Sequence, residues 1–173
     1  ELQDAAYQLG IEAPAFVVEG PKAEVDTSSE MIVIDRRKCI MCGRCIDACN
    51  KVVVNEVLGM GERGHESRVI CDTDRPMADS TCVQCGECSQ LCPVGAIIDK
   101  KAIGKGRVSN LTKVNTTRPY CGVGCQVTLH IDQAANRIVK VTGREIPPNN
   151  GMLCVKGRYG FEFPSSPSVS PSP

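Results

Sequence analysis

An α+β fold made of two small modules is predicted by three features of this 173-residue chain. A run of four cysteines occurs twice with the same spacing, and short apolar segments of strand length flank both copies. Farther along the chain, two segments of alternating polarity are separated by four turn-forming residues. They predict a β-hairpin in a small, mostly β module. The last ten residues are Ser, Pro and one Val, which predicts a disordered tail.

The two cysteine runs share the pattern C-x2-C-x2-C-x3-C, which is the run found in bacterial double-cluster ferredoxins. Three thiolates on a tight loop face one iron–sulfur cube, and the fourth, on the helix that follows, ligates the other cube. Crossing the runs predicts a first cluster on Cys39, Cys42, Cys45 and Cys92, and a second on Cys49, Cys82, Cys85 and Cys88. We therefore expect two [4Fe–4S] clusters and a role in electron transfer.

Two alternative interpretations of the cysteines exist. A structural zinc protein is the first, because zinc sites also use paired C-x2-C spacings. A disulfide framework is the second, since the chain has twelve cysteines. Each run already places four cysteines within eleven residues, and this close repeat favours cluster chelation over both. Oxygen-sensitive clusters would imply a reducing compartment, most simply the cytoplasm.

Composition excludes several classes of partner. The formal net charge is zero, with 20 basic and 20 acidic residues, so nothing indicates a nucleic-acid or membrane surface. No segment has 18 consecutive apolar residues, which argues against membrane insertion. Three Tyr, three Phe and no Trp give each small module few large core side chains. We therefore expect bound clusters to contribute to the stability of the fold.

Five segments are predicted along the chain. Residues 1–30 begin with a helical pattern and continue as a connecting segment, and residues 31–103 form the double-cluster ferredoxin-like module. In that module we expect strands at Met31–Asp35, Ser67–Cys71 and Ala96–Asp99. We also expect a helix that begins near Cys45 and carries Cys49, with the same loop and helix repeated in the second run. Cys71 fits neither run and is predicted to be a buried structural cysteine. Residues 104–113 are predicted to be a linker. Residues 114–163 are the mostly β module, called the third module because it follows residues 1–30 and 31–103, and residues 164–173 are the tail.

The third module contains the predicted hairpin. Its strands are expected at Gln126–Asp132 and Arg137–Thr142, joined by four turn residues. Alternation puts Val127, Leu129 and Ile131 on one face, so we expect His130 on the other face, toward solvent.

The third module also carries a specific resemblance. The stretches TTRPYCGVGCQ and GMLCVKGRYGFEF are similar to the start of the molybdenum or tungsten bis-pterin (alpha) subunit of formate dehydrogenases. The resemblance extends over residues 1–103 to NAD(P)-linked members of that family, to the large iron–sulfur subunit of complex I and to the iron–sulfur modules of iron-only hydrogenases. It implies that Cys121, Cys125 and Cys154 belong to a third [4Fe–4S] site beside a pterin cofactor, and that Lys156 lies between that cluster and the pterin.

The sequence departs from the family pattern at this third site. Arg118 stands where the family has the first of four cysteines, and arginine cannot replace a thiolate. Three cysteines could hold a [3Fe–4S] cluster, or a [4Fe–4S] cluster with an outside ligand, or the site could be empty. Without a pterin domain, the favoured interpretation of Lys156 is a surface lysine. After Phe163 the sequence runs into the Ser/Pro tail rather than a molybdopterin domain, so no catalytic residue for formate is expected here.

The resemblance implies an electron-transfer iron–sulfur subunit or fragment of a formate dehydrogenase-type oxidoreductase of anaerobic metabolism. Its expected partners are a flavin- and NAD(P)H-handling subunit and other iron–sulfur subunits of a redox complex. One alternative is that the chain is the ordered part of an active molybdenum or tungsten formate dehydrogenase. The other is the structural zinc protein.

Overall fold

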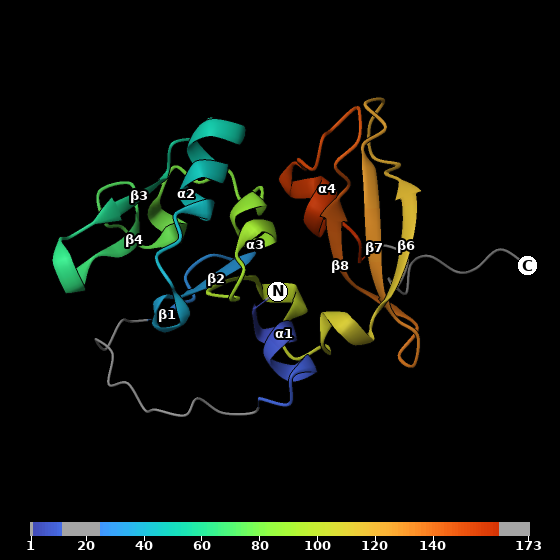
Figure 1. Ribbon diagram of the computed structural model, residues 1–173. Coiled ribbons are helices and arrows are strands. Elements are labelled where there is room, and N and C mark those ends of the chain that lie inside the picture. The colour runs from blue at the N-terminus through green and yellow to red at the C-terminus, as the bar shows by residue number, and fades with distance from the viewer. Residues whose placement is uncertain (1, 12–24, 163–173) are drawn as a thin grey trace, which may run out of the picture. The chain divides into compact units, whose positions relative to one another are not determined.

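The computed structural model describes residues 2–11 and 25–162, and over these ranges the chain combines short helices with short strands (Figure 1). It divides into two compact units, one made of residues 1–82 and 87–98, the other of residues 83–86 and the chain from residue 99 onward. The predicted disordered tail at 164–173 lies outside the described residues, as does the 12–24 part of the connecting segment.

The first unit contains two small sheets. One has the strand order β1-β2-β5, and the other is the antiparallel hairpin of β3 and β4. The strands are β1 (Val25–Asp26), β2 (Ile32–Asp35), β3 (Leu58–Gly61), β4 (Arg68–Cys71) and β5 (Ile97–Asp99). The three strands expected in this region are confirmed to within one residue as β2, β4 and β5. All four residues of β2, the central strand of its sheet, are buried.

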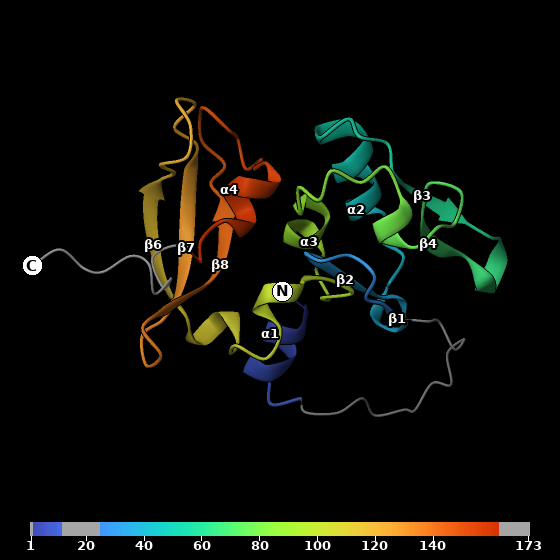
Figure 2. The same ribbon diagram turned by 180° about the vertical axis from the view of Figure 1, so that it is seen from behind.

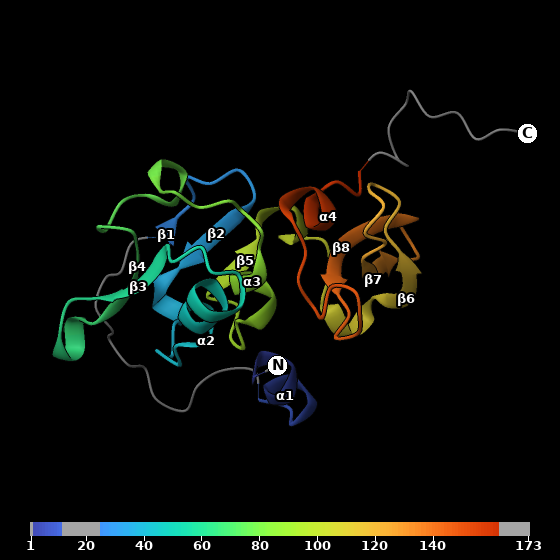
Figure 3. The ribbon, with the colours of Figure 1, turned by 90° about the horizontal axis from the view of Figure 1, so that it is seen from above.

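Short helices complete the first unit, and two of them begin inside the cysteine runs, as expected. The α-helices are α1 (Leu2–Gln8), α2 (Arg44–Asp47) and α3 (Glu87–Leu91), and α2 continues as a π-helical turn over Ala48–Val52. Helices α2 and α3 pack against each other (Figure 3). Single 3₁₀ turns lie at Arg36–Lys38, Gly64–Glu66 and Met77–Asp79. Among the described helices, none has the length and apolar character that crossing a bilayer requires.

The second unit is built on an antiparallel sheet of three strands in the order β6-β7-β8 (Figure 2). The strands are β6 (Thr112–Thr117), β7 (Gln126–Asp132) and β8 (Arg137–Gly143), and α4 (Val155–Tyr159) packs beside β8. Two 3₁₀ turns, Lys100–Ala102 and Val108–Asn110, precede the sheet. The hairpin of β7 and β8 was predicted, whereas β6 was not, and it begins inside the expected linker. All six residues of β6 are exposed, and its sequence, TKVNTT, lacks the alternation of apolar and polar residues that predicts a strand.

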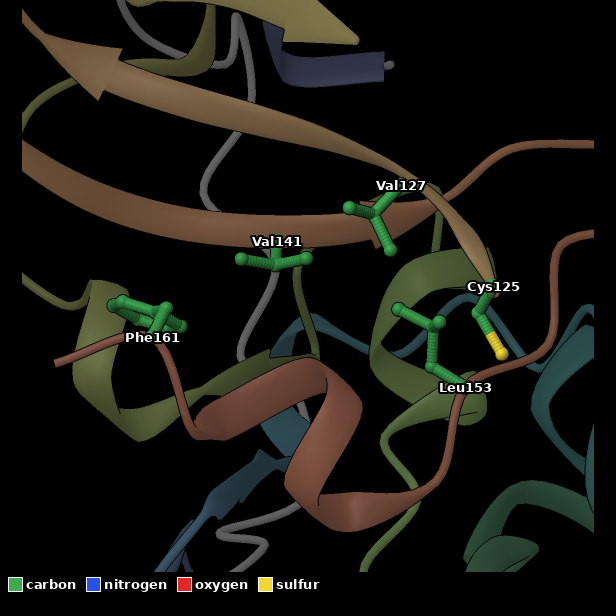
Figure 4. Packing of buried hydrophobic residues seen from close by; sticks show 5 residues of the cluster. All are labelled: Cys125, Val127, Val141, Leu153 and Phe161. Atoms are coloured by element: carbon green, nitrogen blue, oxygen red, sulfur yellow. The ribbon is translucent and has the colours of Figure 1, made fainter. Parts of the chain in front are cut away.

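An apolar cluster joins one face of this sheet to α4 and the chain that flanks it (Figure 4). Its members come from the start of β7, from β8, and from both sides of α4: Cys125, Val127, Val141, Leu153 and Phe161. Leu129 and Ile138 are partly buried against the cluster. The cluster therefore fixes the segment that carries α4 onto the sheet by burying apolar area.

His130 corrects one sequence-based expectation. It lies on the face of β7 predicted to meet solvent, yet it is only 6% exposed. Lys140 stands opposite His130 in the β7–β8 register, and its Nζ is 3.5 Å from Asp99 Oδ2, so the chain at Asp99 covers this face. Strand periodicity tells which residues share a face but not whether both faces are covered. Burial, together with the charges of Lys140 and Lys113, lowers the pKa of His130 to about 4, and Asp99 opposes this only in part.

The buried His130 predicts a specific dependence of stability on pH. Since its folded pKa is depressed to about 4 from 6.5, the unfolded chain binds a proton first as the pH falls, and the folded state loses stability. Between about pH 7.5 and about pH 5.5 we expect this residue to cost roughly 1 kcal/mol of unfolding free energy. Urea unfolding of the cluster-loaded chain at both pH values should show a larger loss for wild type than for His130→Gln. Equal losses in the two proteins would contradict the assignment.

Candidate metal centres

The first candidate centre is a cavity in the first unit that four cysteines line. They are Cys39, Cys42 and Cys45 of the first run and Cys92 of the second. This is the set that the crossed ligation pattern assigns to one cluster. The remaining wall is mostly apolar, with side chains such as Ile34, Val69, Val94 and Ile97. Four sulfur donors in an apolar wall fit the thiolate ligation that iron–sulfur clusters use.

The loop around this cavity turns through left-handed backbone. Met41 has φ 55° and Gly43 has φ 73°, and Gly43 is the residue from which α2 starts. The turn directs the N–H of Met41 to the Sγ of Cys39, 3.4 Å away. On the other side of the cavity, the N–H of Ile97 donates to the Sγ of Cys92 at 3.5 Å. Such N–H groups stabilise negative charge on sulfur and raise the potential of a cluster bound there.

The second run repeats the same loop. Gln84 has φ 52° and Gly86 has φ 75°, which match Met41 and Gly43 at equivalent positions of the repeat. A non-glycine residue in left-handed backbone is uncommon, so its recurrence at both loops is evidence that the two runs form the same local structure. This similarity concerns backbone conformation, and it supports the interpretation of the runs as a duplicated chelating loop.

Electrostatics around the first cavity disfavour four unbound thiolates. Burial raises the pKa of Cys45 to about 11, and the neighbouring sulfurs of Cys39, Cys92 and Cys42 contribute to that rise in that order. Four negative sulfurs at this spacing therefore require a positive partner. The iron ions of a cluster would supply that charge, and a metal coordinates the thiolate rather than the thiol.

The cysteines of the second predicted set lie on α3, on the turn after α2 and in the loop before α3. Cys88 lies on α3 and Cys49 on the π-helical turn after α2, and these two elements pack together. Cys82 is half-buried in the first unit, and Cys85 falls in the segment 83–86 that groups with the second unit. Over residues 2–11 and 25–162, no three His, Cys, Asp or Glu side chains converge on one point suited to a single metal ion. Cys71 is fully buried, and burial raises its pKa to about 12, as expected for a structural cysteine.

The third cysteine group is arranged around Arg118, in the second unit. The Arg118 guanidinium donates from Nη1 to Cys154 Sγ at 2.9 Å and from Nη2 to Cys121 Sγ at 2.7 Å. The backbone N–H of Arg118 donates to the carbonyl of Cys125 at 2.9 Å, and the side chain of Cys125 belongs to the apolar cluster (Figure 4). Arg118 is only 6% exposed. Two of the three predicted sulfurs thus bind the Arg118 guanidinium, while Cys125 binds the backbone of Arg118 through its carbonyl.

The charges at this third group reinforce one another. Burial opposes ionisation of Arg118, but the hydrogen bond to Cys154 and the sulfurs of Cys154, Cys125 and Cys121 outweigh it, so its pKa is raised. Burial likewise opposes ionisation of Cys154, while the N–H of Gly157 and the Arg118 guanidinium favour it, and the pKa of Cys154 is lowered. Arginine and thiolate therefore favour each other's charged forms.

Lys156, predicted from the resemblance to approach a pterin, is exposed on α4. Its Nζ lies 5.4 Å from the centre of the Tyr120 ring, a cation–π distance. Tyr120 in turn donates from its hydroxyl to the carbonyl of Gly160. The cofactor role of Lys156 stays a prediction.

Sequence reasoning missed Arg158, which is fully buried. Its Nε donates to the carbonyl of Cys85 at 2.6 Å, so a cation of α4 binds the second cysteine loop directly. A Cβ added at Gly86 would stand 2.8 Å from Arg158 Nε and still closer to Tyr159 Oη, which is too close for either. Tyr159 Oη also donates to Asp99 Oδ1 at 2.9 Å. The only signal in the sequence was a charged residue close to the third cysteine group, which says nothing about its partner.

Two domain families match the chain, one on each side of the predicted linker. Residues 38–96 match the 4Fe-4S dicluster domain, and residues 111–166 match the molybdopterin oxidoreductase Fe4S4 domain. The first contains both cysteine runs. The second contains the arginine-centred group.

Curated relatives and a solved structure agree with these matches. The chain is 35% identical to the second G-type subunit of the NADH-quinone oxidoreductase of Rhizobium meliloti over 94% of its length, and 28% identical to the alpha subunit of the NADPH-Fe(3+) oxidoreductase of Geobacter sulfurreducens over 96%. It is also 28% identical to a provisionally named formate dehydrogenase of Staphylococcus haemolyticus, over 93% of its length. In these relatives it spans only 19%, 19% and 20% of the full length, respectively.

A similar fold occurs in the crystal structure of an NAD⁺-reducing [NiFe]-hydrogenase in its H₂-reduced state. The TM-score is 0.52 at 30% identity, over 62% of this chain and 46% of the hydrogenase chain. The chain therefore carries iron–sulfur domains of the molybdopterin oxidoreductase type, homologous to those of formate dehydrogenase-like proteins, of the G-type NADH-quinone oxidoreductase subunits and of NAD-reducing hydrogenase.

Proposed function

We propose that this chain is an electron-transfer module of a formate dehydrogenase- or complex I-type oxidoreductase, and that its two cysteine runs hold two [4Fe–4S] clusters. The observation that carries the proposal is the cavity at which Cys92 of the second run joins Cys39, Cys42 and Cys45 of the first. The match of residues 38–96 to a dicluster domain supports it independently of that cavity. The proposed ligands of the second cluster are Cys49, Cys82, Cys85 and Cys88.

A bound [4Fe–4S] cluster supplies one-electron redox chemistry. The chain's own residues set the conditions for it. Ile34 and Ile97 in the cavity wall exclude water, and the N–H groups that point at Cys39 and Cys92 stabilise added negative charge. Cys42 and Ile40 are exposed at one edge of the cavity, so a partner can approach closely there. Electrons would enter or leave at this edge.

The relatives indicate the setting in which such a module works. Proteins named as subunits of NADH-quinone and NADPH-Fe(3+) oxidoreductases match nearly the whole chain. We propose that this chain exchanges electrons with a flavin- and NAD(P)H-handling subunit and with other iron–sulfur subunits, in a reducing compartment such as the cytoplasm. Neither alternative, an active formate dehydrogenase or a structural zinc protein, has an observation that favours it.

Metal content is the first test of this proposal. The anaerobically purified and reconstituted chain should contain about eight iron atoms and as much acid-labile sulfide, since two cubes need four irons each. Elemental analysis and sulfide determination measure both. Near-stoichiometric zinc without sulfide would instead identify a structural zinc protein.

Crossed ligation is tested by matching pairs of variants. Cys92→Ser should give the same loss of signal in low-temperature EPR as Cys39→Ser, because both remove a ligand of the first cluster. Cys49→Ser should match Cys82→Ser for the second cluster. Cys71→Ala is the control, since the buried Cys71 belongs to neither set and both clusters should remain. If Cys92→Ser instead matches Cys82→Ser, each run binds its own cluster and the crossed pattern is wrong.

Electron transfer without formate chemistry is the third expectation. Dithionite should reduce the isolated 173-residue chain, and the reduced chain should pass electrons to an oxidised acceptor such as a flavoprotein. We expect no formate oxidation, because no pterin-binding domain is present among these residues. The decisive assay follows bleaching of the cluster absorbance in two parallel samples, one with dithionite and one with formate. Bleaching in the sample that contains formate and no dithionite would refute the proposal.

A further inference from the structure

The domain that matches residues 111–166 is named for an Fe4S4 cluster, and the cysteines available to this chain do not fit one. Only Cys121, Cys125 and Cys154 lie in this stretch, whereas a cube has four irons to ligate. In the family pattern the missing cysteine is the residue at 118, which is arginine here. The question is what occupies the space between the three cysteines.

The guanidinium of Arg118 lies between two of these cysteines. Its two terminal nitrogens reach two different sulfurs, Cys154 Sγ at 2.9 Å and Cys121 Sγ at 2.7 Å. A cluster bound to these two cysteines would need an iron next to each sulfur. The N–H groups of Arg118 already lie next to both sulfurs. The guanidinium and a cluster therefore compete for the same position.

Packing holds the guanidinium in this position. The backbone N–H of Arg118 is fixed by the carbonyl of Cys125, just after the end of β6, and the Tyr120 ring centre lies 5.8 Å from Arg118 Cζ. Gly157 provides the space: a Cβ added there would stand 3.1 Å from Arg118 Cδ and closer still to Nη1. Arg118 is nine-tenths buried, and its Nε has no hydrogen-bond partner among the described residues. Burying a cation in this way is costly unless charge of the opposite sign faces it.

We infer that Arg118 replaces the iron–sulfur cluster at the third site, with its guanidinium binding two of the three cysteines that would otherwise ligate iron. The site then carries no electron. Its three cysteines and arginine serve to tie the loop after β6 to the start of α4, and the second unit acts as a structural or docking domain. This inference concerns the third site alone and accompanies the two clusters of the proposed function.

The test compares iron content and EPR spectra of the full-length chain in three forms, after identical anaerobic reconstitution. Wild type should hold about eight iron atoms and show no third cluster. Arg118→Cys supplies the fourth thiolate and removes the guanidinium, so iron should rise about 1.5-fold, to about twelve atoms, with a new low-temperature EPR signal. The matched control is Arg118→Cys with Cys154→Ser, which has three cysteines again, so it should gain at most a three-iron cluster and should not show the signal of a third four-iron cluster.

The outcomes separate this inference from the proposed function. A third cluster in the unmodified protein, of either the three-iron or the four-iron type, would overturn the inference and leave the two-cluster proposal intact. Wild type with no iron at all would overturn the proposed function instead. If Arg118→Cys folds, keeps its first two clusters and gains no iron, the guanidinium is not what displaces the third cluster. The wild-type spectrum decides the matter even if the variant fails to fold.

Discussion

Negative charge on closely spaced sulfurs is the constraint on which both units depend. In the first unit burial, and after it the sulfurs of Cys39, Cys92 and Cys42, disfavour ionisation of Cys45, so a group of thiolates in this cavity needs a cation beside it. In the second unit an arginine already supplies that cation. Small domains with few large apolar side chains often rely on such centres. We therefore interpret the two units as two ways of placing positive charge beside clustered sulfurs, one by the iron of the proposed clusters and one by a guanidinium.

The sequence was informative wherever a pattern is local. The cysteine spacing identified two loops, and their backbones match at positions separated by the length of the repeat. Short apolar segments located β2, β4 and β5, and apolar alternation located β7 and β8, because each of these strands buries at least part of one face. The crossed ligand set stays a prediction, although four of its cysteines do line one cavity.

What the sequence could not supply depends on contacts between distant segments. His130 is buried because the chain near Asp99 covers its face, 31 positions earlier in the sequence. β6 forms through pairing with β7 and carries no apolar pattern of its own. Arg118 could be recognised as a departure from a cysteine pattern, but its two hydrogen bonds to sulfur needed the three-dimensional arrangement. The role of Arg158 could not be foreseen, since its partner is a backbone carbonyl far away in the sequence.

The two cysteine loops have the same backbone but unequal freedom to change. Both Gly43 and Gly86 occupy left-handed conformations, so any other residue at either position would be strained. At Gly43 no atom of residues 2–11 or 25–162 lies within 4 Å of where a side chain would begin, so among these residues backbone strain is the only obstacle. At Gly86 a side chain would also displace Arg158 and Tyr159. A duplicated motif has thus become asymmetric: asparagine, which tolerates this backbone, is sterically acceptable in the first copy, while the second can accept glycine alone unless α4 changes with it.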